Sequence, residues 1–355
     1  MRHAWAALFL VGCSSGAGDG APVSPPRDAG RDTAFLYEDT DEPDQGAPED
    51  TLQAATDTAP EAPVDEPRGL GPPYPVVLAH GFAGFRDLGP VHYYFNVARE
   101  LRSVGETVYE SEVAPFLPPR ERAPMLGAFI DRVLRETGRR KVVLIAHSQG
   151  GLDARYLVST LGYGDRVAAV VTVSTPHRGT RLADALLGGT GPGADGFLNG
   201  VATLFGFAYN DVRVRADLRA ALQVMSTAGM EAFNRENPDD PRVLYLSLAG
   251  RSGRRDGREA CAGGERRDDP SRVDIPFLAL LPTVAFLEDG DPVTRVNDGL
   301  VEVRSARWGR FLGCVPADHL DEVGQVARVL PDPISGFDHL ALYRDLVQRL
   351  RREGL

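Results

Sequence analysis

One serine in the sequence has the surroundings of a catalytic nucleophile. Ser148 lies in the run AHSQG, directly after the apolar segment 141–146 and before a segment with helical spacing. A serine at the sharp turn between a buried strand and a helix has its hydroxyl raised above the sheet, where a substrate can reach it. The turn crowds nearby backbone, so small residues are needed two positions before and after the serine, where Ala146 and Gly150 stand. The motif alone arises often by chance, but its place between strand and helix makes Ser148 the candidate nucleophile.

A serine hydroxyl needs a base that removes its proton during attack. When the nucleophile sits on such a turn, an acid and then a histidine follow it in the chain, which leaves three of the seven histidines as candidates. His177 directly follows a predicted strand and is expected to brace the loop beside the nucleophile. His339 opens a terminal helix behind Asp338, a position with a structural explanation. His319 precedes a polar turn and is the preferred base.

The acid must hold the histidine in the correct tautomer and stabilise its protonated form. Asp298, in the run NDGLV, lies in a predicted turn 21 residues before His319. Asp289 and Asp291 are alternatives, but they stand in the very polar run EDGDP, which is typical of a solvated turn.

Negative charge that develops on a substrate oxygen needs preorganised donors, usually backbone N–H groups. One is expected from Gln149, the residue after the nucleophile. The other is expected from Phe82, in the glycine-flanked loop HGFAG that follows the first predicted strand.

These residues depend on strands that alternate with helices. Apolar runs predict strands at 74–79, 106–113, 141–146, 167–174 and 243–248, and helical spacing predicts helices at 91–104, 120–136 and 149–161. Alternation of this kind favours an α/β fold, with a mostly parallel sheet covered by helices on both faces. Residues 74–355 are therefore expected to form one catalytic domain.

The first thirteen residues read as an export signal. Arg2 precedes the short apolar run 4–12, which is too short to span a membrane as a helix, and the run ends in LVGC. This ending resembles the bacterial lipobox, in which Cys13 would be acylated and tether the protein to a membrane. The alternative is an ordinary signal peptide with a chance cysteine. The chain is thus expected to be exported, either as a lipoprotein of the outer membrane or cell surface or as a secreted protein.

Residues 14–73 are rich in Pro, Gly, Ala, Asp and Glu and nearly lack large apolar residues, which predicts a disordered linker. Of the net charge of −11, residues 1–75 contribute −10, from four Arg and fourteen Asp or Glu. The remainder is nearly balanced, which argues against nucleic acid as a partner.

Two cysteines remain after Cys13, and they show no metal-type spacing. In an exported protein a disulfide between Cys261 and Cys314 is the expected outcome, and two buried free thiols are the alternative.

Together these segments resemble the true lipases of the Pseudomonas–Burkholderia family, which have the α/β-hydrolase fold. The matching runs are YPVVLAHGFAGF, AHSQGGLDARY, VSTPHRGT, NDGLV and HLDEVGQ. The resemblance implies a triad of Ser148, Asp298 and His319 and hydrolysis of long-chain acylglycerols through an acyl-enzyme. It also implies, as a partner, the dedicated membrane-anchored folding chaperone that members of this family often need.

A structural calcium ion is also implied by the resemblance. Asp321 would bind it together with the main-chain carbonyls of Gln325 and Val329, since a hard cation prefers oxygen ligands. A second carboxylate would come from upstream, where Asp274 fits best and Asp269 is the competitor.

The family carries its lid where this chain has the apolar, glycine-rich stretch within about 186–235. A mobile amphipathic cover would open at a lipid surface; the alternative is a pair of core helices. The chain also departs from the family, because the stretch 298–314 is longer and Cys261 follows the run VLYLSL rather than preceding it. The disulfide is therefore not the family's, position for position.

Two other functions remain open at this point. The same triad serves an esterase, a phospholipase or an acyltransferase acting on another lipid or polyester. A surface lipoprotein that binds lipid without turnover is the non-enzymatic alternative, against which the intact candidate triad argues.

Overall fold

The computed structural model describes residues 70–84, 87–88, 91–188, 218–253, 258–265, 272–291, 295–325 and 330–355. Cys13, most of the predicted linker, Asp269 and Val329 lie outside these residues. The described helices include none that is both long and apolar enough to cross a membrane.

The centre of the fold is a six-stranded sheet whose neighbouring strands all run parallel, in the order β4-β1-β5-β6-β7-β8. Its strands are β1 (Val76–Ala79), β4 (Val108–Glu110), β5 (Val142–His147), β6 (Val167–Val173), β7 (Leu244–Gly250) and β8 (Arg310–Val315). The short strands β2 (Asp87–Leu88) and β3 (Val91–His92) form a separate antiparallel pair. All residues of β1, β5 and β6 are buried, as expected for strands that have helices on both sides.

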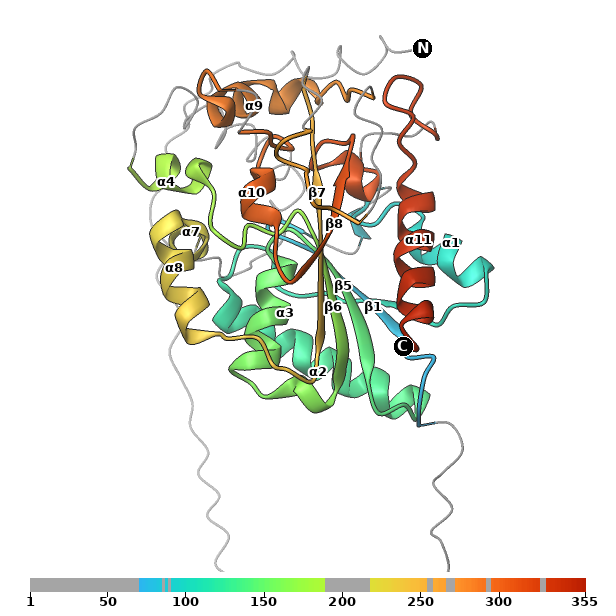
Figure 1. The fold of residues 1–355 in the computed structure, drawn as a ribbon. Coiled ribbons are helices and arrows are strands. Elements are labelled where there is room, and N and C mark those ends of the chain that lie inside the picture. The colour runs from blue at the N-terminus through green and yellow to red at the C-terminus, as the bar shows by residue number, and fades with distance from the viewer. Residues whose placement is uncertain are drawn as a thin grey trace, which may run out of the picture. The chain divides into compact units, whose positions relative to one another are not determined.

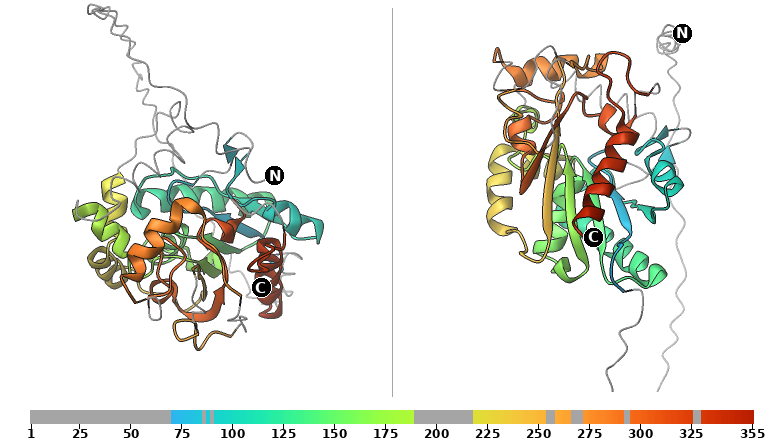
Figure 2. Two further views of the ribbon diagram at one scale, coloured as in Figure 1. Left: turned by 90° about the horizontal axis from the view of Figure 1, so that it is seen from above. Right: turned by 45° about the vertical axis from the view of Figure 1, so that its right-hand side comes forward.

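Helices cover both faces of the sheet (Figure 1). The described helices are α1 (Val97–Ser103), α2 (Pro119–Thr137), α3 (Gly150–Ser159), α4 (Arg181–Gly188), α7 (Leu218–Met225), α8 (Thr227–Glu236), α9 (Leu281–Glu288), α10 (Val303–Ala306) and α11 (His339–Arg352). Short 3₁₀ helices occur at η2 (Tyr163–Asp165), η4 (Leu278–Leu280) and η5 (Asp321–Val323). The right-hand view of Figure 2 shows the cyan α1 and the red α11 on one side of the sheet and the yellow α8 on the other.

Alternate side chains of β5 pack into two hydrophobic cores, one on each face of the sheet. Val143 and Ile145 pack with apolar residues of α1 and α11, whereas Leu144 and Ala146 pack with those of α2 and α3. The predicted α/β fold, with a mostly parallel sheet between helical layers, is confirmed.

Two local predictions differ from the structure. The helix expected at 91–104 begins only at Val97, because Val91 and His92 pair with β2 and Asn96 takes a left-handed conformation with φ of 61°. Strand β8 had no counterpart among the predicted elements. The predicted terminal helix is present as α11, and the Asp338 carboxylate caps it by accepting from the Ala341 N–H at 3.0 Å.

The predicted disulfide is present. Cys261 and Cys314 are bonded, with a Cα–Cα distance of 5.7 Å. The bond ties the segment after β7 to strand β8, across a sequence separation of 53.

The region predicted as a lid is described only in part, because residues 189–217 lie outside the described residues. Its C-terminal part forms α7 and α8, whose buried Met225 and Met230 pack against Leu152 of α3 and Ala183 of α4. The lid therefore stays a prediction.

Candidate active site

Ser148 occupies the turn that joins β5 to α3. Its φ of 55° lies in the left-handed region, which non-glycine residues seldom adopt and which is typical of functional turns. Its N–H donates to the Val173 carbonyl of the neighbouring strand at 2.9 Å. The side chain lies at the carboxyl edge of the parallel sheet, and the residue keeps 9% of its surface exposed.

Two glycines allow the backbone to pass close to this turn. A Cβ atom on Gly81 would lie 2.5 Å from Ser148 Cβ, and one on Gly150 would lie 2.5 Å from the Ala79 carbonyl oxygen. The loop after β1 and the turn after β5 are thus in direct contact. The small residue expected two positions after Ser148 is required for this reason.

Asp298 and His319 form a buried hydrogen-bonded pair. Asp298 Oδ2 accepts from His319 Nδ1 at 2.8 Å, and the other carboxylate oxygen accepts from the N–H groups of Leu300 and Val301. An ionised carboxylate held in this way fixes the Nδ1–H tautomer and leaves His319 Nε2 as the atom that can take a proton.

His319 also lies beside the turn of Ser148. Its ring centroid is 4.4 Å from that of His147, the residue that precedes the serine. The described hydrogen bonds of the His319 side chain run to Asp298 and do not include the Ser148 hydroxyl. Such bonds are often long before substrate binds.

The alternative histidines have other partners. His339 Nε2 bonds to the Phe95 carbonyl oxygen at 2.8 Å. His177 bonds to the Thr172 hydroxyl at 3.0 Å and stacks on Trp308. Both side chains are fully buried in structural positions.

The alternative acid Asp289 is engaged elsewhere. Its carboxylate pairs with Arg181 at 2.9 Å and Arg295 at 2.8 Å. The structure therefore brings Asp298, and not Asp289, to His319.

Two backbone N–H groups beside Ser148 have no acceptor among the described residues, namely those of Phe82 and Gln149. Their neighbours do: Gly81 donates to the Tyr93 hydroxyl at 3.0 Å, and Ala83 donates to the Pro115 carbonyl at 2.8 Å. The two predicted donors are thus available to a substrate oxygen.

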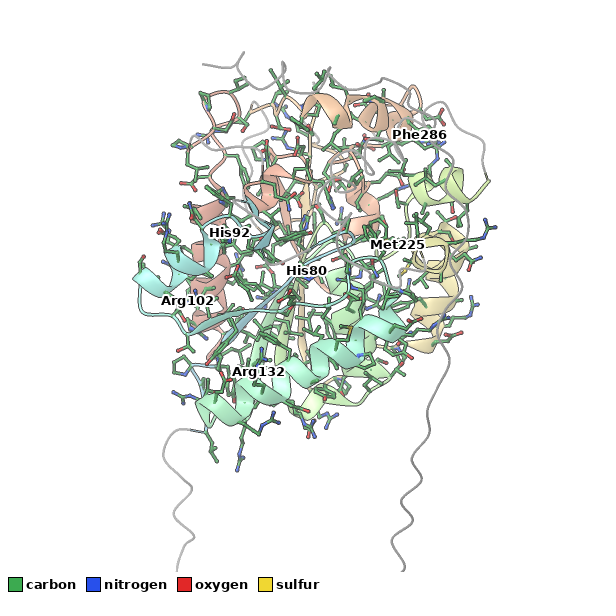
Figure 3. All side chains as sticks on the ribbon, turned by 180° about the vertical axis from the view of Figure 1, so that it is seen from behind. His80, His92, Arg102, Arg132, Met225 and Phe286 are labelled. Atoms are coloured by element: carbon green, nitrogen blue, oxygen red, sulfur yellow. A yellow bond between two sulfur atoms is a disulfide. The ribbon has the colours of Figure 1, made fainter. Side chains whose placement is uncertain are left out.

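The loop that contains Phe82 is built around a neutral histidine, His80, which lies centrally in the rear view of Figure 3. His80 Nε2 accepts from the Val113 N–H at 3.2 Å, and Nδ1 lies 3.1 Å from the Gly81 carbonyl oxygen. Burial and the nearby Arg122 guanidinium lower the pKa of His80 to about 3. The imidazole is therefore a neutral Nδ1–H donor at physiological pH.

Arg122 fastens this loop to α3, and neither its role nor that of Asp153 had been predicted. Its guanidinium donates to the His80 carbonyl at 2.7 Å, to the Ala114 carbonyl at 2.9 Å and to Asp153 at 2.8 Å. Burial raises the pKa of Asp153 to about 6 in spite of Arg122, and the second carboxylate oxygen of Asp153 has no hydrogen-bond partner. Arg122 thereby positions the loop after β1, whose Phe82 N–H is one of the two predicted oxyanion donors.

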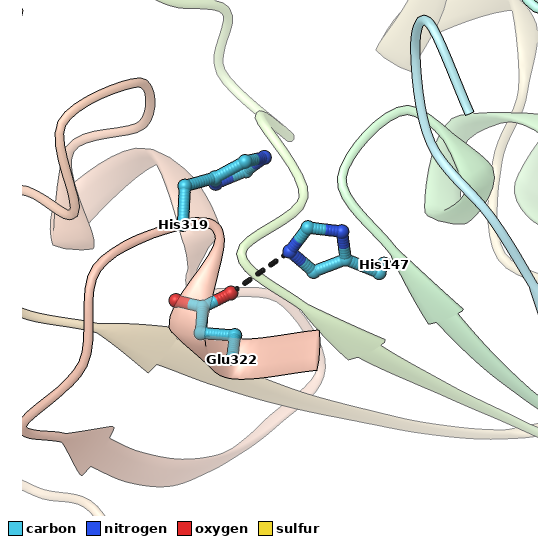
Figure 4. A group of neighbouring side chains, drawn as sticks. All are labelled: His147, His319 and Glu322. Carbon is cyan, nitrogen blue, oxygen red and sulfur yellow. Dashed lines mark hydrogen bonds and ion pairs between the residues drawn. The ribbon is translucent and has the colours of Figure 1, made fainter. Parts of the chain in front are cut away.

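His147 and Glu322 form a second buried pair next to the first (Figure 4). His147 Nε2 lies 3.0 Å from Glu322 Oε2, and His147 Nδ1 lies 2.6 Å from the Tyr93 hydroxyl. Burial and the Asp298 carboxylate raise the pKa of Glu322 well above its usual range, and burial lowers the pKa of His147. Both shifts favour the uncharged forms of this buried pair.

Three aspartates gather at the loop that contains His319. One carboxylate oxygen from each of Asp274, Asp318 and Asp321 lies within 4.8 Å of the other two. Burial, with the neighbouring Asp318 and Asp332 carboxylates, raises the pKa of Asp274 to about 7. Carboxyl groups crowded in this way repel one another unless a proton or a cation is present, and oxygen donors suit a hard cation.

This cluster includes two of the predicted metal ligands, Asp274 and Asp321. Gln325 belongs to the same loop, where its N–H donates to the Leu320 carbonyl at 3.0 Å. Asp318 had not been predicted, although it directly precedes His319. The acidic groups of this cluster could hold a metal ion.

Comparisons with known proteins find relatives in sequence and in fold. The profile of a family described as the alpha/beta hydrolase fold matches residues 74–319, which include Ser148, Asp298 and His319. A triacylglycerol lipase of Pseudarthrobacter phenanthrenivorans is 30% identical over 318 residues, covering 79% of this chain and 98% of the relative. One of Burkholderia plantarii is also 30% identical, covering 79% and 87%. The crystal structure of Staphylococcus hyicus lipase matches with a TM-score of 0.57 at 19% identity, covering 81% of this chain and 98% of that one.

Proposed function

We propose, from the premise that this chain belongs to the bacterial triacylglycerol lipases of the α/β-hydrolase fold, that it hydrolyses long-chain acyl esters, and triacylglycerols in particular, through an acyl-enzyme. The observation that carries the proposal is the 2.8 Å bond between Asp298 and His319 next to the turn of Ser148.

In the first half of the reaction, Ser148 Oγ attacks the ester carbonyl carbon while His319 Nε2 takes the hydroxyl proton. The carbonyl oxygen becomes an oxyanion, which accepts from the N–H groups of Phe82 and Gln149. The bond to the alcohol oxygen then breaks, and His319 returns the proton to the departing alcohol.

In the second half, a water molecule takes the place of the alcohol. His319 removes a proton from the water, whose oxygen attacks the acyl carbon. The ester bond to Ser148 breaks and the proton passes to Ser148 Oγ, which releases the free acid. Asp298 stays ionised throughout and stabilises the imidazolium of His319.

A structural calcium ion is part of the proposal. Asp274 and Asp321 would hold it, with Asp318 adjacent and with the carbonyl oxygens of Gln325 and Val329 as further ligands. When bound, the ion would neutralise the crowded carboxylates and stabilise the loop that contains His319. It takes no part in the chemical steps.

The proposal also includes the location of the enzyme and its partners. Acylation of Cys13 would hold the catalytic part at a bacterial membrane through the acidic linker. A lid within residues 186–235 would cover the acyl site until the enzyme meets a lipid surface. A dedicated folding chaperone is proposed only by analogy with the family.

The test is a chain-length series of nitrophenyl esters and emulsified triacylglycerols, measured with the wild type and Ser148→Ala. The proposal predicts turnover of long acyl chains that disappears in Ser148→Ala. A strict preference for short chains would instead favour an esterase. Binding of lipid with no turnover of any ester would favour the non-catalytic lipoprotein.

A further inference from the structure

A cluster of three arginines, which takes no part in the proposed catalysis, lies where α10 approaches the start of α8; both helices are labelled in Figure 1. Arg178 comes from the loop after β6, and Arg304 and Arg307 come from α10 and the residue after it. A cavity of about 410 Å³ is lined by all three arginines together with Thr227, Ser305 and one carboxylate, that of Glu302. A second cavity of about 380 Å³ shares Arg178 and Arg307 and adds Trp308 and Asp239.

The positive charge of this cluster is only partly compensated. Arg304 pairs with the buried Glu302 at 3.2 Å. Within the described part of the chain, Arg178 and Arg307 have no carboxylate partner; Arg178 donates to the carbonyl oxygens of Arg304 and Arg307, and Arg307 donates to that of Ala260. Arg178 is exposed at the surface, and partial desolvation together with the Arg307 charge lowers its pKa. Bringing two guanidinium groups together without a counterion costs free energy that a bound anion would recover.

The two uncompensated arginines are also held in place before any ligand arrives. The backbone N–H of Arg178 donates to Ser305 Oγ at 3.1 Å, and the Ser305 hydroxyl donates to the Gly179 carbonyl at 2.6 Å. These two bonds join the loop after β6 to α10. The Arg307 guanidinium lies over the Phe311 ring, 4.4 Å from its centroid. Little side-chain entropy remains to be lost on binding, as in a preorganised site.

We propose that this arginine cluster is a binding site for a phosphate group. Planar guanidinium forks match the oxygens of a phosphate through paired hydrogen bonds, and a phosphate monoester has the charge to neutralise two arginines at once. Thr227 and Ser305 line the same cavity, but their hydroxyl groups already donate to the Asp184 carboxylate and the Gly179 carbonyl, so the arginines are the donors to the phosphate oxygens. The phosphate can belong to a soluble compound or to the headgroup of an anionic lipid, since the chemistry recognised is the same.

The experiment uses the full chain with Ser148→Ala, so that no lipid is consumed. Pyrophosphate binding is measured by calorimetry, and vesicle binding is compared between phosphatidylcholine alone and phosphatidylcholine that contains phosphatidic acid. The proposal predicts binding in at least one of the two assays. Arg307→Gln should weaken that binding about tenfold, and the double variant Arg178→Lys with Arg307→Gln should weaken it further. Arg120→Gln, at an exposed arginine on α2, is the matched control and leaves binding unchanged.

The two arms separate the sources. Binding of pyrophosphate indicates a soluble phosphate compound, and binding only of phosphatidic acid vesicles indicates a lipid headgroup. The proposal is overturned by no binding in either arm, by variants that bind as the parent does, or by equal displacement with chloride at matched ionic strength. Melting curves of each variant verify that the fold is intact.

Discussion

Asp298 and His319 are connected twice, once through their side chains at 2.8 Å and once through the His319 N–H, which donates to the Asp298 carbonyl oxygen at 2.9 Å. The second bond joins the two loops as well as the two functional groups. A displacement of either loop therefore moves the proposed acid and base together, which preserves the orientation of the imidazole.

The contact between Gly81 and Ser148 predicts a large effect from one methyl group. In Gly81→Ala the new Cβ would lie 2.5 Å from Ser148 Cβ, so the loop and the nucleophile turn must separate. We expect kcat to fall by about 100-fold, since small misplacements of reacting groups cost this much. Gly71→Ala is the control, because its Cβ would have no heavy atom within 4 Å. Equal activity of both variants would show that the close approach is unimportant.

The buried Asp153 predicts a pH dependence of stability. Its pKa is about 6 in the folded state, above the ordinary value, so folding favours the protonated form. The free energy of unfolding should therefore decrease as the pH rises through this range, by about 3 kcal/mol from this group.

The variant Asp153→Asn isolates that contribution. Urea unfolding of both proteins between pH 4 and pH 7.5 should show the wild type losing stability relative to the variant as the pH rises. Stability curves that run parallel over this range would mean that Asp153 titrates normally.

The disulfide predicts a loss of stability when both cysteines are replaced. The bond closes a loop with a sequence separation of 53, and chain entropy then gives about 4 kcal/mol. Urea unfolding of Cys261→Ala with Cys314→Ala, compared with the oxidised wild type, measures the difference. Midpoints that coincide would refute the prediction, and reduced wild type serves as a second comparison.

The aspartate cluster predicts opposite effects of Asp274→Asn with and without calcium. Without the ion, the variant should melt at a higher temperature than the wild type, because one of the crowded acids is gone. With calcium at a hundred times its Kd, the wild type should gain about 2.7 kcal/mol and the variant much less. A melting temperature of the wild type that changes neither with calcium nor with a chelator would contradict the proposed calcium site.

Much of the site could be predicted because its signals are local in the sequence. The buried strand before Ser148 fixes the type of turn, and the chain order then leaves few histidines to choose from. His339 could be set aside since the cap at Asp338 explains it, and the structure confirms that cap.

The remaining parts depend on contacts that no local pattern reveals. Strand β8 has Gly313 in its middle with φ of 120°, and its register with β7 shifts there, so it lacks the regular apolar run of the other strands. Arg122 and Asp153 read as ordinary polar residues of two helices, yet the fold buries both. His147 and Glu322 are 175 residues apart, and only the folded chain brings them together.

Covalent labelling tests the central claim most directly. A phosphonate ester with a nitrophenyl leaving group should react with the wild type, release one equivalent of nitrophenol and leave its phosphonyl group on the peptide that contains Ser148, as mass spectrometry of a digest would show. Ser148→Ala should remain unlabelled and inactive toward esters. Labelling of a different residue, or ester hydrolysis by Ser148→Ala at the wild-type rate, would contradict the assignment of Ser148 as the nucleophile.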